Sequence, residues 1–310
     1  MRRFWVAVFL CTVVVAAFVL IMMYIPPPPV TLKPQVGIFF YVWYNPADEE
    51  SWDRSKIVDR PVLGYYNSSD PAVIRQQLLL IEELGVDFVV ISWWGFYDDD
   101  GIFRDGAARQ VFETAQSINS ALKFAVMVEP FNETGDSYDY GGIYDRVFDT
   151  FVEPYSGLYY NYSGKPLICF FNNESLTDNG VFPQDEESRF NVVTVGQQFY
   201  TDWIYTDLNV YDLPAHDPRG QVSVTPRFDD SRYREPSCVV DPNLTEEVYD
   251  LKEWENALKL VREGKVSFVL ISSWNEYVER TQIEPCYDGT AAVPSDFLYN
   301  ITKEKISQLG

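Results

Sequence analysis

The chain has little of what most metal and nucleophile chemistry requires. It contains one histidine, His216, and four cysteines among 310 residues. No Cys/His group has the spacing of a zinc site, and a lone histidine in the turn-like stretch Pro-Ala-His-Asp-Pro argues against a Ser/His/Asp arrangement. Lysine and arginine number 24 against 46 acidic residues, giving a formal net charge of −22. So acidic a chain argues against nucleic acid or anionic lipid as a partner. From the lack of a Cys/His group we predict no metal, and we also predict no cofactor.

The few cysteines support at most one disulfide bond. Cys11 lies in an apolar stretch and Cys169 in an apolar predicted strand, so both are interpreted as packing residues. Cys238 and Cys286 lie in predicted loops, and a disulfide between them is one alternative in an oxidising compartment. The sequence does not give their separation, so this alternative stays open.

The N-terminus has the pattern of a membrane anchor. The 22 residues from Phe4 to Ile25 carry no charge, and a helix of that length, about 33 Å, crosses a hydrocarbon core of about 30 Å. Arg2 and Arg3 precede it, which predicts a cytoplasmic N-terminus. A cleaved signal peptide is the alternative, but no small-x-small cleavage pattern follows the stretch before Pro26. We therefore predict a cytoplasmic segment at 1–3, a transmembrane helix at 4–25 and a Pro-rich linker at 26–35.

Residues 36–310 are then expected to be an extracellular or lumenal domain of a single-pass membrane protein. Six Asn-x-Ser/Thr sequons are consistent with a glycoprotein that passes a glycosylation machinery. They stand at Asn67, Asn132, Asn161, Asn173, Asn243 and Asn300.

Apolar runs alternate with helical patterns along this domain. Helical periodicity is clearest at 72–84, 107–118 and 246–263. Eight strands are predicted, at 36–42, 88–92, 123–128, 166–171, 192–195, 203–206, 221–225 and 267–272. This alternation over about 275 residues predicts an α/β fold of the (β/α)₈ TIM-barrel type. A doubly wound sheet is the alternative, although residues 42–46 hold aromatics where a nucleotide-binding fold places glycines.

Two glutamates three residues apart, Glu276 and Glu279, follow the last predicted strand. Residues at i and i+3 of a helical turn lie about 5–6 Å apart at Cβ. Retaining glycosidases place their two carboxyl groups about 5 Å apart, so the pair suits glycosidic bond cleavage. A solvated acidic loop is the alternative. Against it, sugar sites combine aromatic platforms with amide groups, and the pair has such neighbours in Trp274, Asn275, Tyr277 and Gln282.

The segment Trp-Asn-Glu-Tyr-Val-Glu-Arg-Thr-Gln-Ile-Glu, which contains this pair, resembles the Asn-Glu-Trp-His-Glu-Gly-Thr-Gln-Ile-Glu signature of glycoside hydrolase family 99, the endo-α-1,2-mannosidases and mannanases, and of related domains of polysaccharide loci. Further segments agree in the family's order, and the likeness covers nearly all of the chain after residue 35. They are Val36–Tyr44, Leu63–Gln76, Gly85–Gly95, Val128–Phe131 and Thr225–Asp230.

The resemblance implies a retaining hydrolase of α-mannosidic linkages whose substrate is a mannose-containing oligosaccharide or polysaccharide. In this family the sugar's own 2-hydroxyl attacks the anomeric carbon and forms a 1,2-anhydro sugar. On the matching positions Glu276 would deprotonate that hydroxyl and Glu279 would protonate the leaving oxygen. Substrate-binding residues are expected at the ends of the strands: Tyr41, Trp43, Tyr44, Trp93, Trp94, Glu129, Trp274, Asn275, Tyr277 and Gln282.

The chain also departs from the family pattern. Arg280 replaces the family's glycine, Val278 its histidine, and Met127 the histidine before Ile-Glu-Pro. An arginine beside Glu279 is expected to favour the ionised carboxylate, which is awkward for a general acid. Two alternatives therefore stay open: a catalytically silent glycan-binding barrel, and a glycosidase for another sugar in which Glu129 and Glu279 act as a direct acid and nucleophile pair.

Overall fold

The computed structural model describes residues 33–130, 139–171, 185–196, 202–204, 220–235, 237, 239–240 and 251–310. These residues belong to one compact unit that runs from Lys33 to Gly310. Within these ranges no helix is both long and apolar enough to span a bilayer. The predicted membrane helix at 4–25 lies outside the described residues, so the anchor remains a prediction.

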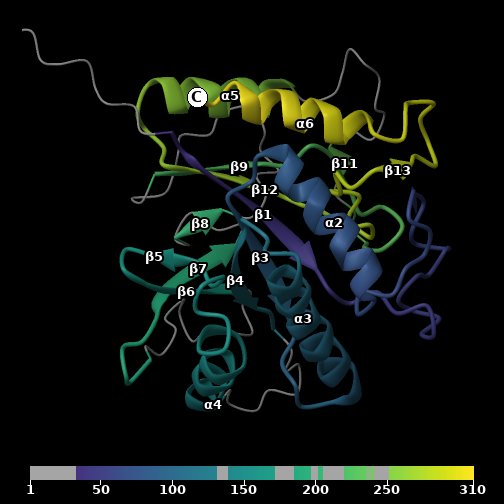
Figure 1. Ribbon diagram of the computed structural model, residues 1–310. Helices are drawn as coiled ribbons and strands as arrows, with labels where there is room; N and C mark the ends of the chain where they lie inside the picture. Colours follow the sequence, from purple (N-terminus) through teal and green to yellow (C-terminus); the bar gives the residue numbers. More distant parts are fainter. Residues whose placement is uncertain are drawn as a thin grey trace, which may run out of the picture. The chain divides into compact units, whose positions relative to one another are not determined.

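The unit is built on a curled parallel sheet (Figure 1). Its strands are β1 (Gln35–Tyr41), β3 (Phe88–Trp93), β4 (Lys123–Val128), β6 (Lys165–Phe171), β7 (Asn191–Gly196), β8 (Trp203–Ile204), β9 (Gln221–Val224) and β12 (Phe268–Ile271). The hydrogen-bonded order is β8-β7-β6-β4-β3-β1-β12-β9, and the short β5 (Asn161–Tyr162) joins β6 in antiparallel register. All eight predicted strands are therefore confirmed, although residues 205–206 of the sixth lie outside the described ranges.

The order of these strands is that of an eight-stranded barrel. Followed from β1 through β3, β4, β6, β7 and β8, each strand pairs with the next one in sequence, and on the other side β9 pairs with β12 and β12 returns to β1. Between β8 and β9 the described residues record no strand pairing. Because parallel strands share one direction, their carboxyl ends all lie at one edge of the sheet.

Helices cover the outer side of this sheet. They are α2 (Pro71–Leu84), α3 (Asp99–Ser117), α4 (Tyr140–Val147) with the π-helical turn η1 (Phe148–Val152), α5 (Leu251–Arg262) and α6 (Phe297–Ser307). Asp70 caps α2 by accepting from the Ala72 N–H at 2.8 Å, and Gly85 ends the helix with φ of 84°, as the sequence predicts. Helix α3 starts eight residues earlier than its predicted start at residue 107, because Asp98 accepts from the Gly101 N–H and caps the helix there.

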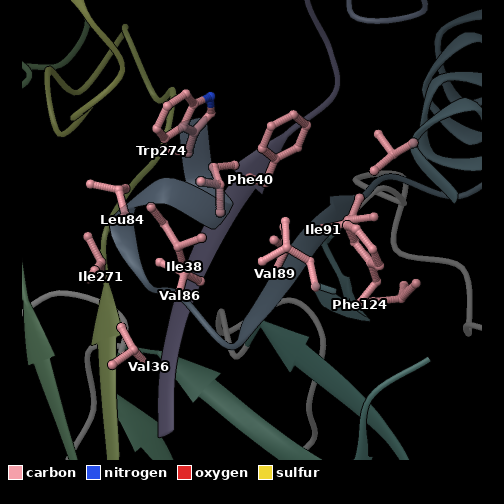
Figure 2. Close-up of a cluster of buried hydrophobic side chains, with 14 of the residues drawn as sticks. Val36, Ile38, Phe40, Leu84, Val86, Val89, Ile91, Phe124, Ile271 and Trp274 are labelled. Atoms are coloured by element: carbon pink, nitrogen blue, oxygen red, sulfur yellow. The ribbon is translucent and has the colours of Figure 1, made fainter. Parts of the chain in front are cut away.

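Successive residues of each strand contribute to two different cores. Val36, Ile38 and Phe40 of β1 pack with the helices in a large outer cluster (Figure 2). Phe39 and Tyr41, the residues between them, pack inside the curled sheet with Phe88, Val90, Leu270 and others. The runs read as buried strands because both faces of a barrel strand are covered.

Two small sheets follow the main strands and fasten their loops. β2 (Arg60–Pro61) pairs with β13 (Cys286–Tyr287), and β10 (Phe228–Asp229) pairs with β11 (Val239–Val240). Cys286 is a buried free thiol. Cys238, the other cysteine of the disulfide alternative, lies outside the described residues.

Gly37 of β1 lies where the side chains of Phe88 and Leu270 pack closely against the backbone of the strand. We predict that Gly37→Ala is destabilising. A Cβ at this position would lie 2.4 Å from the Phe88 ring and 2.7 Å from a Leu270 methyl group. Overpacking of this kind costs about 1–3 kcal/mol in the free energy of unfolding. Gly106→Ala is the matched control, because its Cβ meets nothing within 4 Å inside α3, and we expect a gain of about 0.5–1 kcal/mol. Urea unfolding measures both, and equal stability of the Gly37→Ala variant and wild type would contradict this packing.

Candidate active site

Three glutamates form a buried acid cluster at the carboxyl edge of the sheet. Glu129 directly follows β4, while Glu276 and Glu279 lie on the segment after β12. Glu129 is 5% exposed and Glu276 is 2% exposed, and the Glu279 side chain is 16% exposed. Burial raises the pKa of all three, and the charge of Glu279 further raises the pKa of both other glutamates. The structure thus brings together the two predicted catalytic residues and the predicted ligand Glu129.

Glu129 is held by a short chain of hydrogen bonds from β3. The Ser92 hydroxyl donates to Glu129 Oε1 at 2.9 Å, and Trp94 Nε1 donates to Ser92 Oγ at 2.9 Å. Burial outweighs this hydrogen bond and raises the pKa of Glu129 to about 8. At neutral pH this carboxyl is therefore mostly protonated.

Glu279 pairs with Arg234, a residue that sequence reasoning missed. Arg234 Nη1 lies 2.5 Å from Glu279 Oε1 and 3.3 Å from Asp230 Oδ2. The guanidinium lowers the pKa of Glu279, but burial has the larger effect and the pKa stays above its ordinary value. The available signal was the stretch Ser-Arg-Tyr-Arg, which directly follows the Phe-Asp-Asp motif.

The prediction that Arg280 favours ionised Glu279 is wrong, because the Arg280 side chain points away from it. With φ of 55°, Arg280 turns into a buried ion network whose centre is Asp59. Arg280 donates to both Asp59 oxygens at 3.1 Å and to Asp229 at 3.0 Å. The side chain that replaces the family's glycine therefore binds Asp59 and Asp229 and does not contact the acid cluster.

Arg227 completes this network from the end of β9. It donates to Asp59 Oδ2 at 2.7 Å, to Asp288 Oδ2 at 2.5 Å and to the Arg280 carbonyl at 2.9 Å. Gln282 Nε2 also donates to Asp59, at 2.6 Å. Gln282 was predicted to bind substrate, but it is fully buried in this network. Its amide is used to satisfy a buried carboxylate, as buried charges require.

Three further predicted substrate-binding residues connect the segment that carries Glu276 and Glu279, here called the acid segment, to the end of β1. The Asn275 amide bonds to both backbone groups of Tyr41, at 2.8 and 2.9 Å. The Tyr44 hydroxyl donates to the Asn275 carbonyl at 2.7 Å and accepts from the Tyr277 N–H at 3.0 Å. Asn275, Tyr44 and Tyr277 are fully buried, so these contacts give them a positioning role.

Glu284 is another buried carboxyl, and it binds Tyr277 of the acid segment. It accepts from the hydroxyls of Tyr66 and Tyr277 at 2.8 and 2.7 Å, and from Gln77 Nε2 of α2 at 2.8 Å. Burial raises the pKa of Glu284 to about 7. The sequence signal was the final glutamate of the Thr-Gln-Ile-Glu motif, which we had not assigned a role.

Trp93 and Trp274 do not reach the acid cluster. Trp93 packs in the outer core and donates from Nε1 to Asp105 of α3 at 3.1 Å. Trp274 packs beside Phe40 (Figure 2), with its ring 6.5 Å from that of Tyr299 on α6. Their predicted role in substrate binding is corrected to core packing, because Trp93, the last residue of β3, and Trp274, after β12, both belong to the outer cluster that packs with the helices.

An aromatic surface remains beside Glu129. The rings of Tyr41 and Trp43 are 4.5 Å apart between centroids, and those of Trp43 and Trp94 are 5.8 Å apart. Trp43 and Trp94 are half-buried. Trp93 and Trp94 thus point to opposite sides of the sheet, so that Trp94 contributes to the predicted platform. No group of three metal-ligating side chains occurs within the ranges that the structure describes.

Comparisons with known proteins find relatives in sequence and in fold. No family model matches the chain. A curated mouse protein, glycoprotein endo-alpha-1,2-mannosidase-like protein, is 29% identical over 120 residues, and its human counterpart is 28% identical over 120 residues. These matches cover 37% of the chain and only 25% of each relative, so the chain spans about a quarter of their length.

Solved structures extend the likeness to the whole fold. The GH99 endo-alpha-mannosidase from Bacteroides thetaiotaomicron superposes with a TM-score of 0.66 at 19% identity, over 89% of this chain and 97% of that one. A structure described as a glycoside hydrolase-like protein gives a TM-score of 0.60 at 13% identity, over 91% and 96% of the two chains. These comparisons confirm the resemblance to glycoside hydrolase family 99. The family 99 motifs in this chain are thus carried on a family 99 fold.

The burial of Glu129 predicts that stability falls as pH rises. An unfolded glutamate has a pKa of about 4.3, whereas that of folded Glu129 is about 8. Between these values the native state holds the extra proton, so its stability is full below pH 4 and is lost towards pH 8. Glu129→Gln should reduce this loss, on the order of a few kcal/mol between pH 5 and pH 8.

Urea unfolding at several pH values measures this effect. The exposed Glu153→Gln variant is the matched control and should keep the wild-type pH dependence. If the Glu129→Gln variant showed the same pH dependence as wild type, the Glu129 carboxyl would have an ordinary pKa in the folded protein, which would contradict this prediction.

Proposed function

We propose that this chain is a glycoside hydrolase that cleaves α-mannosidic linkages within glycans, on a closed (β/α)₈ barrel. The observation that carries the proposal is the acid cluster, in which the carboxyls of Glu276, Glu279 and Glu129 influence one another's ionisation. Glycosidases need one carboxyl that donates a proton and another that accepts one, with pKa values held apart by their surroundings. The family 99 likeness in sequence motifs and fold supports mannose as the sugar.

In the proposed mechanism Glu276 deprotonates the substrate's 2-hydroxyl, which attacks the anomeric carbon and forms a 1,2-anhydro sugar. In an α-mannoside the axial 2-hydroxyl lies opposite the axial leaving group, so this attack is in line. Glu279 protonates the leaving oxygen and then activates water. The Val278 N–H donates to Glu276 Oε1 at 3.0 Å and supports its anionic form.

The half-buried rings of Trp43 and Trp94 are proposed to hold the sugar rings that flank the bond, with the buried Tyr41 ring packed against Trp43. Aromatic rings offer apolar faces that suit the C–H side of a pyranose ring. The membrane anchor at 4–25, with the N-terminus in the cytoplasm, and the placement of residues 36–310 outside the cytoplasm are also proposed, on the uncharged stretch and the arginines before it.

Glu276→Gln and Glu279→Gln should each lower kcat by about 10²–10⁴-fold on a fluorogenic α-1,2-mannobioside, because each removes a proton-transfer group. The isosteric amides should leave thermal unfolding close to that of wild type. Glu153→Gln, an exposed change of the same type, should keep full activity. An unaltered turnover rate in either cluster variant would remove that residue from the mechanism.

The 2-hydroxyl route predicts retention of the α configuration without a sugar attached to the protein. A 2-fluoro mannosyl substrate with a good leaving group should be inert, since it lacks the internal nucleophile, and intact-protein mass spectrometry should show no adduct. A sugar adduct on Glu129 would favour the direct carboxylate mechanism instead. Wild-type protein that binds manno-oligosaccharides without cleaving any would favour the silent binder.

A further inference from the structure

Arg234 joins the surface of the protein to the buried acid cluster. It lies on the turn after β10, and its side chain is 48% exposed, whereas that of Glu279 is 16% exposed. Arg234 Nη1 lies 2.5 Å from Glu279 Oε1. A buried carboxyl therefore pairs with a cation that is itself open to solvent.

The turn that carries Arg234 is attached to the acid segment by contacts that do not involve Arg234. The Asp229 N–H donates to the Glu279 carbonyl at 2.9 Å, and Asp229 Oδ2 accepts from Arg280 Nη1 at 3.0 Å. The backbone around Glu279 is thus fixed independently of the Arg234–Glu279 ion pair. Departure of Arg234 from Glu279 requires a side-chain rotation alone.

Arg234 makes two further contacts that do not involve Glu279. Asp230 Oδ2 lies 3.3 Å from Arg234 Nη1, and the Tyr233 ring centroid lies 5.1 Å from the Arg234 Cζ. Both neighbours are on the same turn as Arg234. Because Asp230 already shares Arg234 Nη1 with Glu279, a rotation away from Glu279 leaves the guanidinium beside a carboxylate partner.

The ion pair conflicts with the roles that the proposed mechanism requires. Glu279 faces Arg234 and Asp230 from the β10 turn, Glu276 from its own segment and Glu129 from the end of β4. Repulsion among the three carboxyls disfavours their joint ionisation, and the Arg234 guanidinium favours the negative charge on Glu279. Burial and the negative charge of Glu279 both raise the pKa of Glu276, which favours its protonated form. The mechanism needs the reverse distribution.

We propose that Arg234 is a positioning residue that holds Glu279 as a carboxylate in the resting protein and leaves it when a glycan binds. This inference rests on the proposed function. On release, one proton passes from the Glu276 carboxyl to the Glu279 carboxylate, so the total charge of the cluster is unchanged. Glu276 becomes the base and Glu279 the acid when the substrate is in place.

The resting ion pair is tested without substrate. The carboxyl carbons of protein labelled with ¹³C at glutamate Cδ are titrated by NMR, and Glu279→Gln assigns the Glu279 signal. Arg234→Gln should raise the titration midpoint of Glu279 by on the order of one pH unit, because the stabilising cation is lost. Arg234→Lys, which keeps the charge, should stay near wild type.

Arg232→Gln is the matched control, since it removes the same charge from an exposed residue of the same turn. We expect it to leave the midpoint of Glu279 unchanged. Equal midpoints in wild type and the Arg234→Gln variant would overturn the proposal.

Kinetics then test the release. The pH dependence of kcat/KM reports the ionisations of the free enzyme, and that of kcat reports those of the enzyme–substrate complex. In the Arg234→Gln variant the alkaline limb of kcat/KM should therefore move to higher pH, whereas the alkaline limb of kcat should coincide with that of wild type, because Arg234 has already left Glu279 in the complex. Both limbs should stay in place in the Arg232→Gln variant, and a shifted alkaline limb of kcat in the Arg234→Gln variant would contradict the release. A fixed alkaline limb of kcat/KM in the Arg234→Gln variant would contradict the ion pair between Arg234 and Glu279, even in a fully active enzyme. A protein whose Glu279 midpoint moves as expected but which hydrolyses no α-mannoside would support the ion pair and contradict the proposed function.

Discussion

The segment after β12 is held in one conformation by buried polar contacts on both of its sides, and the arrangement of the acids depends on that restraint. On one side Asn275 bonds to the backbone of Tyr41 at the end of β1. On the other side Arg280 is bound to Asp59. Charges this deeply buried are stabilising only when fully paired. The chain meets that condition around Asp59 and so fixes the backbone on which Glu276 and Glu279 lie.

The carboxyls of the acid cluster have fewer hydrogen-bond and ion-pair partners than Asp59. Asp59 is surrounded by two guanidinium groups, an amide and a backbone N–H. Glu129 has a hydroxyl donor, and Glu279 has one half-exposed arginine. Poorly compensated burial raises the pKa of these glutamates. Carboxyls with a raised pKa are what a general acid needs.

The fold could be predicted from the sequence because apolar runs and helical periodicity recur along the chain, and each predicted strand lies in the sheet. The acid cluster was also predicted, since residues that directly follow parallel strands meet at one edge. The direction of single side chains could not be predicted. Trp93 and Trp94 differ by one position, and this decides which of them packs on α3. Arg234 and Asp59 were missed because their partners are distant in sequence.

The central claim is that Glu276 acts on the 2-hydroxyl of an α-mannoside and Glu279 on its glycosidic oxygen. A crystal structure of the Glu276→Gln variant with an α-1,2-linked manno-oligosaccharide tests it most directly. The account predicts the 2-hydroxyl of the scissile mannose within hydrogen-bond distance of residue 276, with the glycosidic oxygen beside Glu279 and the sugar rings on Trp43 and Trp94. An oligosaccharide bound away from the acid cluster, or one that places its 2-hydroxyl against Glu129, would contradict it.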